Sequence, residues 1–336
     1  MRYCVVAGNR CSGARGGGLY VSGGIAEVED CVFVENAAIL ANSDAGAIGM
    51  SASGDAVIRG CVFLGNYATG GVFPAIGGAI QANAGTTIDG CTILGNLLSG
   101  SSVQGGAVYG PVTVTNSIVR GNAQPQFAGG ASARYSDVEG GAAGAGNFDA
   151  VPAFVDEPGR DFHLTATSPC VDAGDPRLTD PDGTRRDVGA FVFASLYVRS
   201  NARSSDWTSP SWPELSAVVG GQIVLRTLSE GTPGGTYLML GTTSGATPGI
   251  VLGGQTVPLN PDSYTAFCLG SPNSALLGNS LGALDPRGSA ETVFVLPSIP
   301  TGLPAPLTLH HATLVAGTPG SLQFVTNAVE STVVAH

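Results

Sequence analysis

Four aspartates that lie close together in the sequence could bind a metal ion. Asp175, Asp180, Asp182 and Asp187 fall within one short segment, and Asp182 is followed by a glycine. Carboxylates carried on turns are ligands that Ca²⁺ prefers, so the group predicts a calcium site. The alternative is a turn in which the aspartates bond the backbone and pair with Arg185 and Arg186. The glutamate that closes an EF-hand loop is missing from this segment.

A few charged residues nearer the N-terminus could act in polysaccharide cleavage. β-Elimination needs a base beside a C–H bond, and glycoside hydrolysis needs paired carboxylates. The sequence up to residue 135 contains no Asp-Asp or Asp-x-Asp pair, so we expect no two of these residues to form a catalytic cluster. The candidates are Arg59, Arg120, Glu35, Asp55 and Asp89.

The overall charge restricts the class of partner. All 14 basic residues are arginine, and 25 acidic residues give a net charge of −11. A field of this sign disfavours nucleic acid and repels acidic polysaccharides unless Ca²⁺ or a local arginine patch intervenes. No stretch approaches the roughly 20 apolar residues of a membrane helix, so we expect no transmembrane segment. The 51 glycines and 43% hydrophobic residues indicate many short strands joined by tight turns.

An internal repeat must position these side chains. Its first element is a Cys or Ser followed five residues later by Asn, and it recurs after 27, 30, 30 and 26 residues. A small-residue pair leads into a second β-prone segment, and a third precedes the next Cys. The first elements are Cys4–Asn9, Cys31–Asn36, Cys61–Asn66, Cys91–Asn96 and Ser117–Asn122.

Segments this short cannot bury a face alone, so they must stack on their equivalents in neighbouring repeats. We expect a coil of three parallel sheets with rungs ~4.8 Å apart and an inward-facing core. The Asn at each corner should adopt the left-handed conformation, although a ligand-binding role is an alternative. Stacked cysteines should be core residues, although disulfides between rungs are an alternative. The inward ladders should be Cys4, Cys31, Cys61 and Cys91; Phe33, Phe63 and Ile93; and Val28, Ile58, Ile88 and Val114.

The C-x-[FI]-x-x-N and G-G-A-[IV] patterns over residues 1–135 resemble the right-handed β-helix repeats of the pectin-lyase-like superfamily. They are also similar to the repeats of bacterial surface adhesins and polymorphic outer-membrane proteins. The resemblance implies the fold, and it implies no single activity because that superfamily mixes lyases, hydrolases and adhesins.

Residues 147–193 resemble the segment that follows β-helix repeats in many bacterial surface proteins. The match rests on the runs around Phe154, Asp161-Phe-His-Leu164, Ser168-Pro-Cys-Val-Asp-Ala-Gly-Asp175 and Asp180 to Ala190. Cys170 and Phe191-Val192 depart from that pattern, and the loss of an acid at Val192 weakens the case for a cation site.

The C-terminal part has strand-like runs separated by turns, which predicts a β-sandwich. Phrases such as Tyr237-Leu-Met-Leu-Gly241 are similar to a C-terminal module of exported proteins from planctomycete-type bacteria. His310 and His311 could suggest a metal, but neighbours on a strand point to opposite faces. The expected strands are residues 222–228, 236–241, 291–296, 307–315 and 322–325.

Together these patterns predict an all-β chain, a right-handed parallel β-helix followed by a β-sandwich-like domain. We expect residues 1–194 to form the β-helix, with repeats over 1–135 and a closing segment over 136–194. Residues 195–336 should form the second domain. A linker that proteases can cleave should lie near residues 193–216.

The function predicted is a non-catalytic secreted or cell-surface protein with an adhesin-like binding or structural role. The alternative is a polysaccharide lyase or glycoside hydrolase. We expect an extracellular or cell-surface location, a glycan or cell-surface component as partner, and Ca²⁺ as the one candidate cofactor. The uncovered first rung, which begins near Met1, also predicts self-association.

Overall fold

The structure is a computed structural model that describes the chain apart from residues 3, 13–14, 40–43, 72, 181–183, 194–195, 200–213, 218–220, 230–231, 287, 300, 302–305, 318–320 and 335–336. It divides into two compact units, Met1–Phe193 and Ala194–His336. Most of the expected linker at 193–216 lies outside the described residues.

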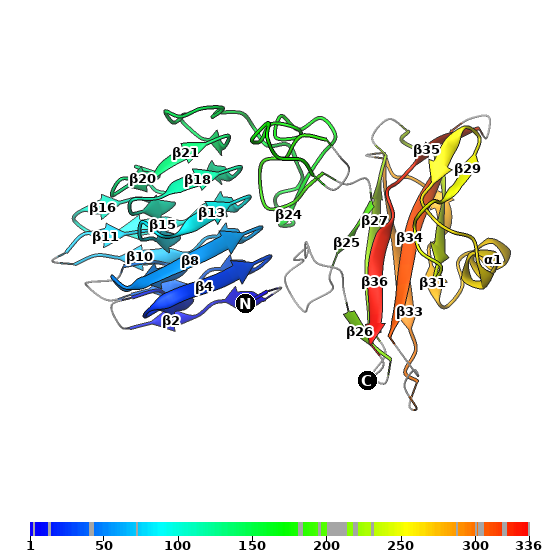
Figure 1. Cartoon of the computed structure of the whole chain (residues 1–336), viewed down its shortest axis with the longest axis horizontal. Helices are drawn as coiled ribbons and strands as arrows, with labels where there is room; N and C mark the ends of the chain where they lie inside the picture. Colours follow the sequence, from blue (N-terminus) through cyan, green and yellow to red (C-terminus); the bar gives the residue numbers. More distant parts are fainter. Residues whose placement is uncertain are drawn as a thin grey trace. The chain divides into compact units, whose positions relative to one another are not determined.

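The first unit is a coil of short parallel strands (Figure 1). Sheet 1 contains β1 (Val5–Ala7), β5 (Val32–Val34), β9 (Val62–Leu64), β14 (Thr92–Leu94), β19 (Ile118–Arg120) and β22 (Asp137–Val138). Sheet 2 contains β2 (Arg10–Cys11), β6 (Ala37–Ala38), β10 (Tyr67–Thr69) and β15 (Leu97–Ser99). Sheet 3 contains β3 (Leu19–Val21), β7 (Ile48–Met50), β12 (Ile80–Gln81), β17 (Val108–Tyr109) and β20 (Phe127–Ala128). Sheet 4 contains β4 (Gly24–Glu29), β8 (Gly54–Arg59), β13 (Thr87–Asp89), β18 (Thr113–Thr115) and β21 (Ser132–Arg134).

The expectation of three sheets is therefore wrong, because the described rungs contain four. The additional sheet 2 begins directly after each corner asparagine. Its strands are two or three residues long and include Ala37–Ala38, so they carry no alternation that a sequence pattern could reveal. Two further strands, β11 (Ala75–Ile76) and β16 (Val103–Gln104), pair in the loops between sheets 2 and 3.

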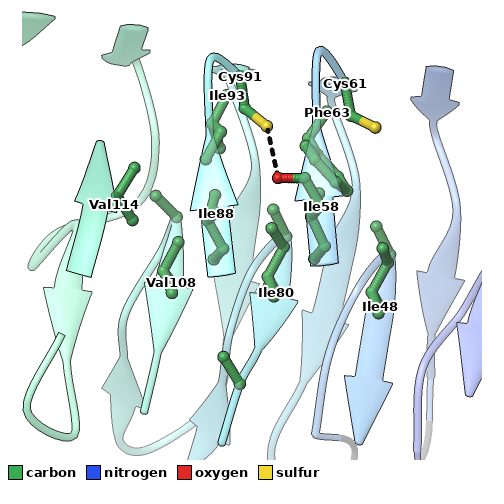
Figure 2. Packing of buried hydrophobic residues seen from close by; sticks show 14 of the residues in the cluster. Ile48, Ile58, Cys61, Phe63, Ile80, Ile88, Cys91, Ile93, Val108 and Val114 are labelled. Carbon is green, nitrogen blue, oxygen red and sulfur yellow. Dashed lines mark hydrogen bonds between the residues drawn. The ribbon is translucent and has the colours of Figure 1, made fainter. Parts of the chain in front are cut away.

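The inward ladders are confirmed. Phe33 stands opposite Phe63, and Phe63 opposite Ile93, in the register of sheet 1. The rings of Phe33 and Phe63 stack with centroids 5.1 Å apart. Figure 2 shows the aliphatic side chains of Ile58, Ile88 and Val114 directed into the same core. Cys31, Cys61 and Cys91 are buried there as free thiols.

The corners differ from the expectation in one respect. The positive φ angle belongs to the residue before each asparagine, for example Gly65 at +60° and Glu35 at +53°. The asparagine side chain instead points inward and bonds along the coil. The glycine pairs opening sheet 3 are required by close approach, since a Cβ on Gly46 would lie 2.1 Å from the Gly78 carbonyl oxygen.

The closing segment follows the last rung and has its own small core. Its hairpin pairs β23 (Phe154–Asp156) with β24 (Asp161–Leu164). Phe154 meets Phe162 edge to face with centroids 5.3 Å apart, and His163 stacks on Phe191 at 4.4 Å. Phe162, Leu164 and Phe191 are buried.

The second unit has the mainly antiparallel sheets expected of a β-sandwich-like domain, with one parallel strand pair between residues 214–216 and 332–334, which confirms the fold class. One sheet contains β25 (Leu196–Arg199), β27 (Gly221–Leu228), β33 (Ser289–Leu296) and β31 (Leu277–Gly278). The other contains β26 (Glu214–Ser216), β36 (Val329–Val334), β34 (Leu307–Ala316), β28 (Thr236–Thr242) and β32 (Leu281–Ala283), with β35 (Leu322–Val325) beside β34. A hairpin joins β29 (Ile250–Leu252) to β30 (Gln255–Val257).

The expected strands at 222–228, 236–241, 291–296, 307–315 and 322–325 are all present. The helix α1 (Ser263–Gly270) was not predicted, although Asp262 caps its N-terminus through the Tyr264 and Thr265 amides. Among the described residues, no helix has the length and apolar character needed to cross a membrane.

Candidate functional site

The described aspartates of the proposed calcium group are each held by protein donors. Asp175 accepts hydrogen bonds from the Arg177 guanidinium, 2.6 Å from Oδ2, which lowers the Asp175 pKa to about 2. Asp187 accepts the Asp172 amide at 2.7 Å and the Phe193 amide at 2.5 Å. Burial nevertheless raises the pKa of Asp187 to about 6. Asp180 accepts the Asp187 amide at 2.7 Å.

This geometry agrees with the alternative of a hydrogen-bonded turn, except in the partners of Arg185. Arg186 lies 3.9 Å from Asp180, as the turn alternative expects. Arg185 does not pair with a carboxylate among the described residues; it donates to the carbonyl oxygens of Gly174 and Ala173. Within the described ranges, no three His, Cys, Asp or Glu side chains are grouped to hold a metal. Asp182 lies outside those ranges, so calcium at this turn stays a prediction.

The same segment covers the outer face of sheet 1. The Asp175 amide donates to the Asn116 side-chain oxygen at 2.7 Å, and the Ala190 amide donates to the Thr92 hydroxyl at 2.9 Å. Gly189, with φ +119°, approaches so closely that a Cβ there would lie 2.8 Å from the Ile118 Cδ1 atom. Thr92 and Ile118 are therefore fully buried although they point away from the core.

An arginine between two carboxylates joins the last rungs to this segment. The Arg120 Nη1 atom lies 3.0 Å from Asp137 Oδ1 and 2.8 Å from Asp149 Oδ1. Asp137 is fully buried, and burial is the main reason why its pKa is raised. Neither carboxylate was among the candidates that the sequence offered. Asp137 and Asp149 lie beyond the quoted repeats, so the period did not reveal them.

A second ion-paired column runs along the outer face of sheet 4. Glu29 stands opposite Arg59, and Arg59 opposite Asp89, in the strand register. The Arg59 guanidinium lies 3.4 Å from Glu29, while Asp89 accepts the Thr115 hydroxyl at 2.6 Å. The repeat contained this signal, because every member precedes a repeat Cys or Ser by two residues. Further along the column, Arg2 pairs with Glu29 and Arg134 stands opposite Thr115.

Comparison with known proteins identifies this coil. Residues 2–141 match the family model described as "Right handed beta helix region". This part of the chain is a right-handed β-helix. Neither a search of curated proteins nor one of solved structures gave a match. The match ends within the last rung of the β-helix and leaves out most of the closing segment and the C-terminal domain.

The remaining sequence candidates have separate surroundings in the β-helix. Glu35 pairs with Arg160 of the closing segment at 2.5 Å. Asp55 lies 3.5 Å from the Thr86 hydroxyl. Glu29 and Glu35 are thus ion-paired with Arg59 and Arg160, as in a structural ion-pair network, and Asp89 lies 3.6 Å from Arg186.

The two histidines of the C-terminal domain face apart, as expected. His310 reaches Glu330 at 3.4 Å, whereas His311 is fully buried and bonds the Tyr264 hydroxyl at 2.9 Å. They share no ligand position, and burial lowers the pKa of His311 to about 3.

Proposed function

We propose that the chain is a non-catalytic secreted or cell-surface protein whose β-helix has an adhesin-like binding or structural role. The observation that carries the proposal is the burial of the sheet 1 outer face under residues 147–193. Thr92 and Ile118, which an open sheet would present to a substrate, lie against Gly189 and Ala190. A glycan chain cannot reach Thr92 or Ile118 while the closing segment is docked.

The exposed face of sheet 4 supports binding more than catalysis. Glu27, Val57, Thr87, Thr113 and Ser132 stand in one row, in which only Val57 is half-buried and the others are exposed. The Thr113 and Ser132 hydroxyls lie 3.1 Å apart. Three of the five are small hydroxyl side chains, and in the neighbouring row the carboxylates of Glu29 and Asp89 are engaged by Arg59 and Thr115. A rigid face of this kind suits recognition of an extended partner.

One observation favours the alternative of a carbohydrate-active enzyme. The Arg59 side chain is about half exposed, at 52%, and stands between Glu29 and Asp89 in the register of sheet 4. An arginine between two acids is the composition that a lyase site would need, provided that a substrate displaced the ion pair.

The extracellular or cell-surface location is part of the proposal and rests on sequence resemblance. Residues 147–193 resemble the segment that follows β-helix repeats in bacterial surface proteins. The C-terminal domain is similar to a module of exported planctomycete-type proteins. Detection of the native protein by surface labelling of intact cells would test this location.

The test of catalysis uses a panel of acidic and neutral glycans, with and without Ca²⁺. Unsaturated ends report elimination and reducing ends report hydrolysis. We expect no turnover by the wild-type protein. Turnover that disappears in Arg59→Met, while Arg134→Met retains it, would establish the enzyme and overturn the proposal.

A further inference from the structure

The hairpin of β29 and β30 in the second unit is a small sheet with one open edge. β29 pairs with β30 and with no other strand among those that the structure describes. Ile250 is 38% exposed, Val251 75% and Leu252 48%, so β29 presents three large apolar side chains in succession. A two-stranded sheet is marginally stable by itself, and an uncovered apolar edge pairs readily with another strand.

The hairpin is attached to the rest of the domain through its other strand. Gly253 and Gly254, with φ +57° and +85°, form the two-residue turn between β29 and β30. The Gln255 side-chain amide donates to the Gln323 carbonyl oxygen of β35 at 2.7 Å, and Val257 is buried in the core of the domain. β29 is thereby held in an extended conformation before any partner binds, which reduces the entropy lost on pairing.

The turn determines which backbone groups lie on the open edge. In a hairpin with a two-residue turn, the residues that flank the turn exchange both backbone hydrogen bonds, and bonded pairs then alternate along the ladder. Leu252 and Gln255 flank the turn, so the next bonded pair in the register is Ile250 with Val257. The N–H and C=O groups of Val251 consequently point away from β30, toward the open edge.

The features that usually protect an open edge are missing from β29. Proteins commonly place charged side chains or proline on such strands, and β29 contains neither. No charged residue occurs between Glu230 and Asp262, although the whole chain has a net charge of −11, and β35 beside the hairpin is uncharged as well. Two copies of an acidic chain repel each other, so an uncharged edge is a place where they can approach.

On these grounds we propose that β29 pairs antiparallel with β29 of a second copy of this chain. A two-fold axis at Val251 makes the pairing self-complementary, because the Val251 N–H of each copy donates to the Val251 carbonyl oxygen of the other. Ile250 of each copy then lies opposite Leu252 of the other, on the face of the hairpin that also carries Val257.

The two hairpins together form one four-stranded antiparallel sheet. The pairing closes with two copies, because the two-fold axis uses the open edge of both, and it therefore yields a dimer rather than a fibre. The contact belongs to the C-terminal domain, so it goes beyond the role proposed for the β-helix and does not depend on it.

Sedimentation equilibrium over a range of protein concentrations tests the pairing. We expect a concentration-dependent dimer, with Val251→Pro raising its Kd about tenfold or more because both intermolecular hydrogen bonds lose their N–H donor. The monomer should tolerate this proline, since the Val251 N–H takes no part in the hairpin. Val251→Thr keeps the N–H and the β-branched shape, so this matched control should leave the Kd unchanged.

A second variant tests the contact without proline. Leu252→Glu places a charge against Ile250 of the other copy, twice in each dimer, and should also weaken dimerisation. Leu281→Glu adds the same charge at an exposed position of β32 and should not. Amide hydrogen exchange reports the pairing directly, because the Val251 amide should be protected only at concentrations at which the dimer forms.

Two outcomes would overturn the proposal. A protein that stays monomeric at high concentration, with a freely exchanging Val251 amide, would show that the edge accepts no second copy. A dimer that neither Val251→Pro nor Leu252→Glu weakens would place the contact elsewhere, for example at the first rung of the β-helix.

Discussion

The buried asparagines form a continuous ladder of side-chain amides through the β-helix. The Asn66 Oδ1 atom accepts the Asn36 side-chain amide at 3.0 Å, and Asn66 Nδ2 donates to Asn96 Oδ1 at 2.9 Å and to the Phe33 carbonyl oxygen at 3.0 Å. Each amide thus serves two rungs. Because Asn36, Asn66, Asn96 and Asn122 are buried, the side-chain amides of these four bond within the β-helix and the ladder is structural.

We therefore expect Asn66→Ala to lower the free energy of unfolding by about 3 kcal/mol, because it leaves buried polar groups on both neighbouring rungs without a partner. Asn9→Ala is the matched control. Asn9 is exposed at the first rung and donates one side-chain bond, to Asn36, so the expected loss is under about 1 kcal/mol. Urea denaturation would measure both values, and equal losses would contradict the cooperative ladder.

The burial of Phe63 predicts the effect of a charge in the core on folding. Phe63 is fully buried and stacked on Phe33, so Phe63→Asp places an unpaired charge in the core and should prevent folding of the β-helix. Phe73→Asp adds the same charge at an exposed position and should leave folding intact. Far-ultraviolet circular dichroism and soluble yield distinguish the two. If Phe63→Asp melted like the wild type, the inward assignment of sheet 1 would be untenable.

At the scale of elements, the closing segment determines which faces of the β-helix are open. It bonds Thr92 of sheet 1 and Asn116 at the corner before sheet 1, and its Asp149 reaches Arg120. The outward residues Val32, Val62, Thr92 and Ile118 of sheet 1 are buried, whereas Val5 on the first strand is 50% exposed. The sequence indicates this burial, because Val32-Phe-Val34 and Val62-Phe-Leu64 are continuous apolar runs, which are typical of strands buried on both faces.

Removal of the arginine that connects these elements should weaken their association. Arg120→Met leaves the fully buried Asp137 without its ion-pair partner, and we expect a loss of about 3 kcal/mol with faster hydrogen exchange over residues 136–193. Arg59→Met, at an exposed ion pair, should cost less than about 1 kcal/mol. A similar small effect of both substitutions would show that Arg120 does not anchor the segment.

At the scale of the whole molecule, the two units should respond to pH in opposite directions. Burial raises the Asp187 pKa to about 6, beside Asp180 and Asp172, so folding of the first unit takes up a proton that the unfolded chain lacks. Its stability should fall as pH rises from about 4 to about 6. Burial lowers the His311 pKa to about 3, beside His310, so the unfolded second unit binds the proton first. Its stability should fall as pH drops below about 6.5.

Calorimetric scans at several pH values between about 4 and 7 test this prediction. Asp187→Asn should flatten the pH dependence of one transition and His311→Gln that of the other. The lowered pKa of Asp175 acts mainly below this window, as does that of Asp262. Two transitions that moved together with pH, or a single transition unaffected by either variant, would contradict the assignment.

The sequence by itself determined the β-helix and its core. The recurrence of Cys, Phe or Ile, and Asn at fixed offsets specifies a register, because a shift of one residue would turn Phe63 outward and Val62 inward. The strands of the C-terminal domain were predictable for a related reason. Runs such as Gln222–Leu228 are long enough to show their β propensity without reference to any partner.

Only the tertiary structure decided which outer faces are open and which charges meet. Asp137 and Asp149 pair with Arg120, and Gly189 packs on Ile118, through contacts between segments that share no repeat. Sheet 2 also depended on tertiary context, since Ala37–Ala38 becomes a strand through its neighbours Arg10 and Tyr67 rather than through its own propensity. A period in the sequence specifies what stacks on itself, whereas contacts between unrelated segments follow from the folded path of the chain, which no local pattern encodes.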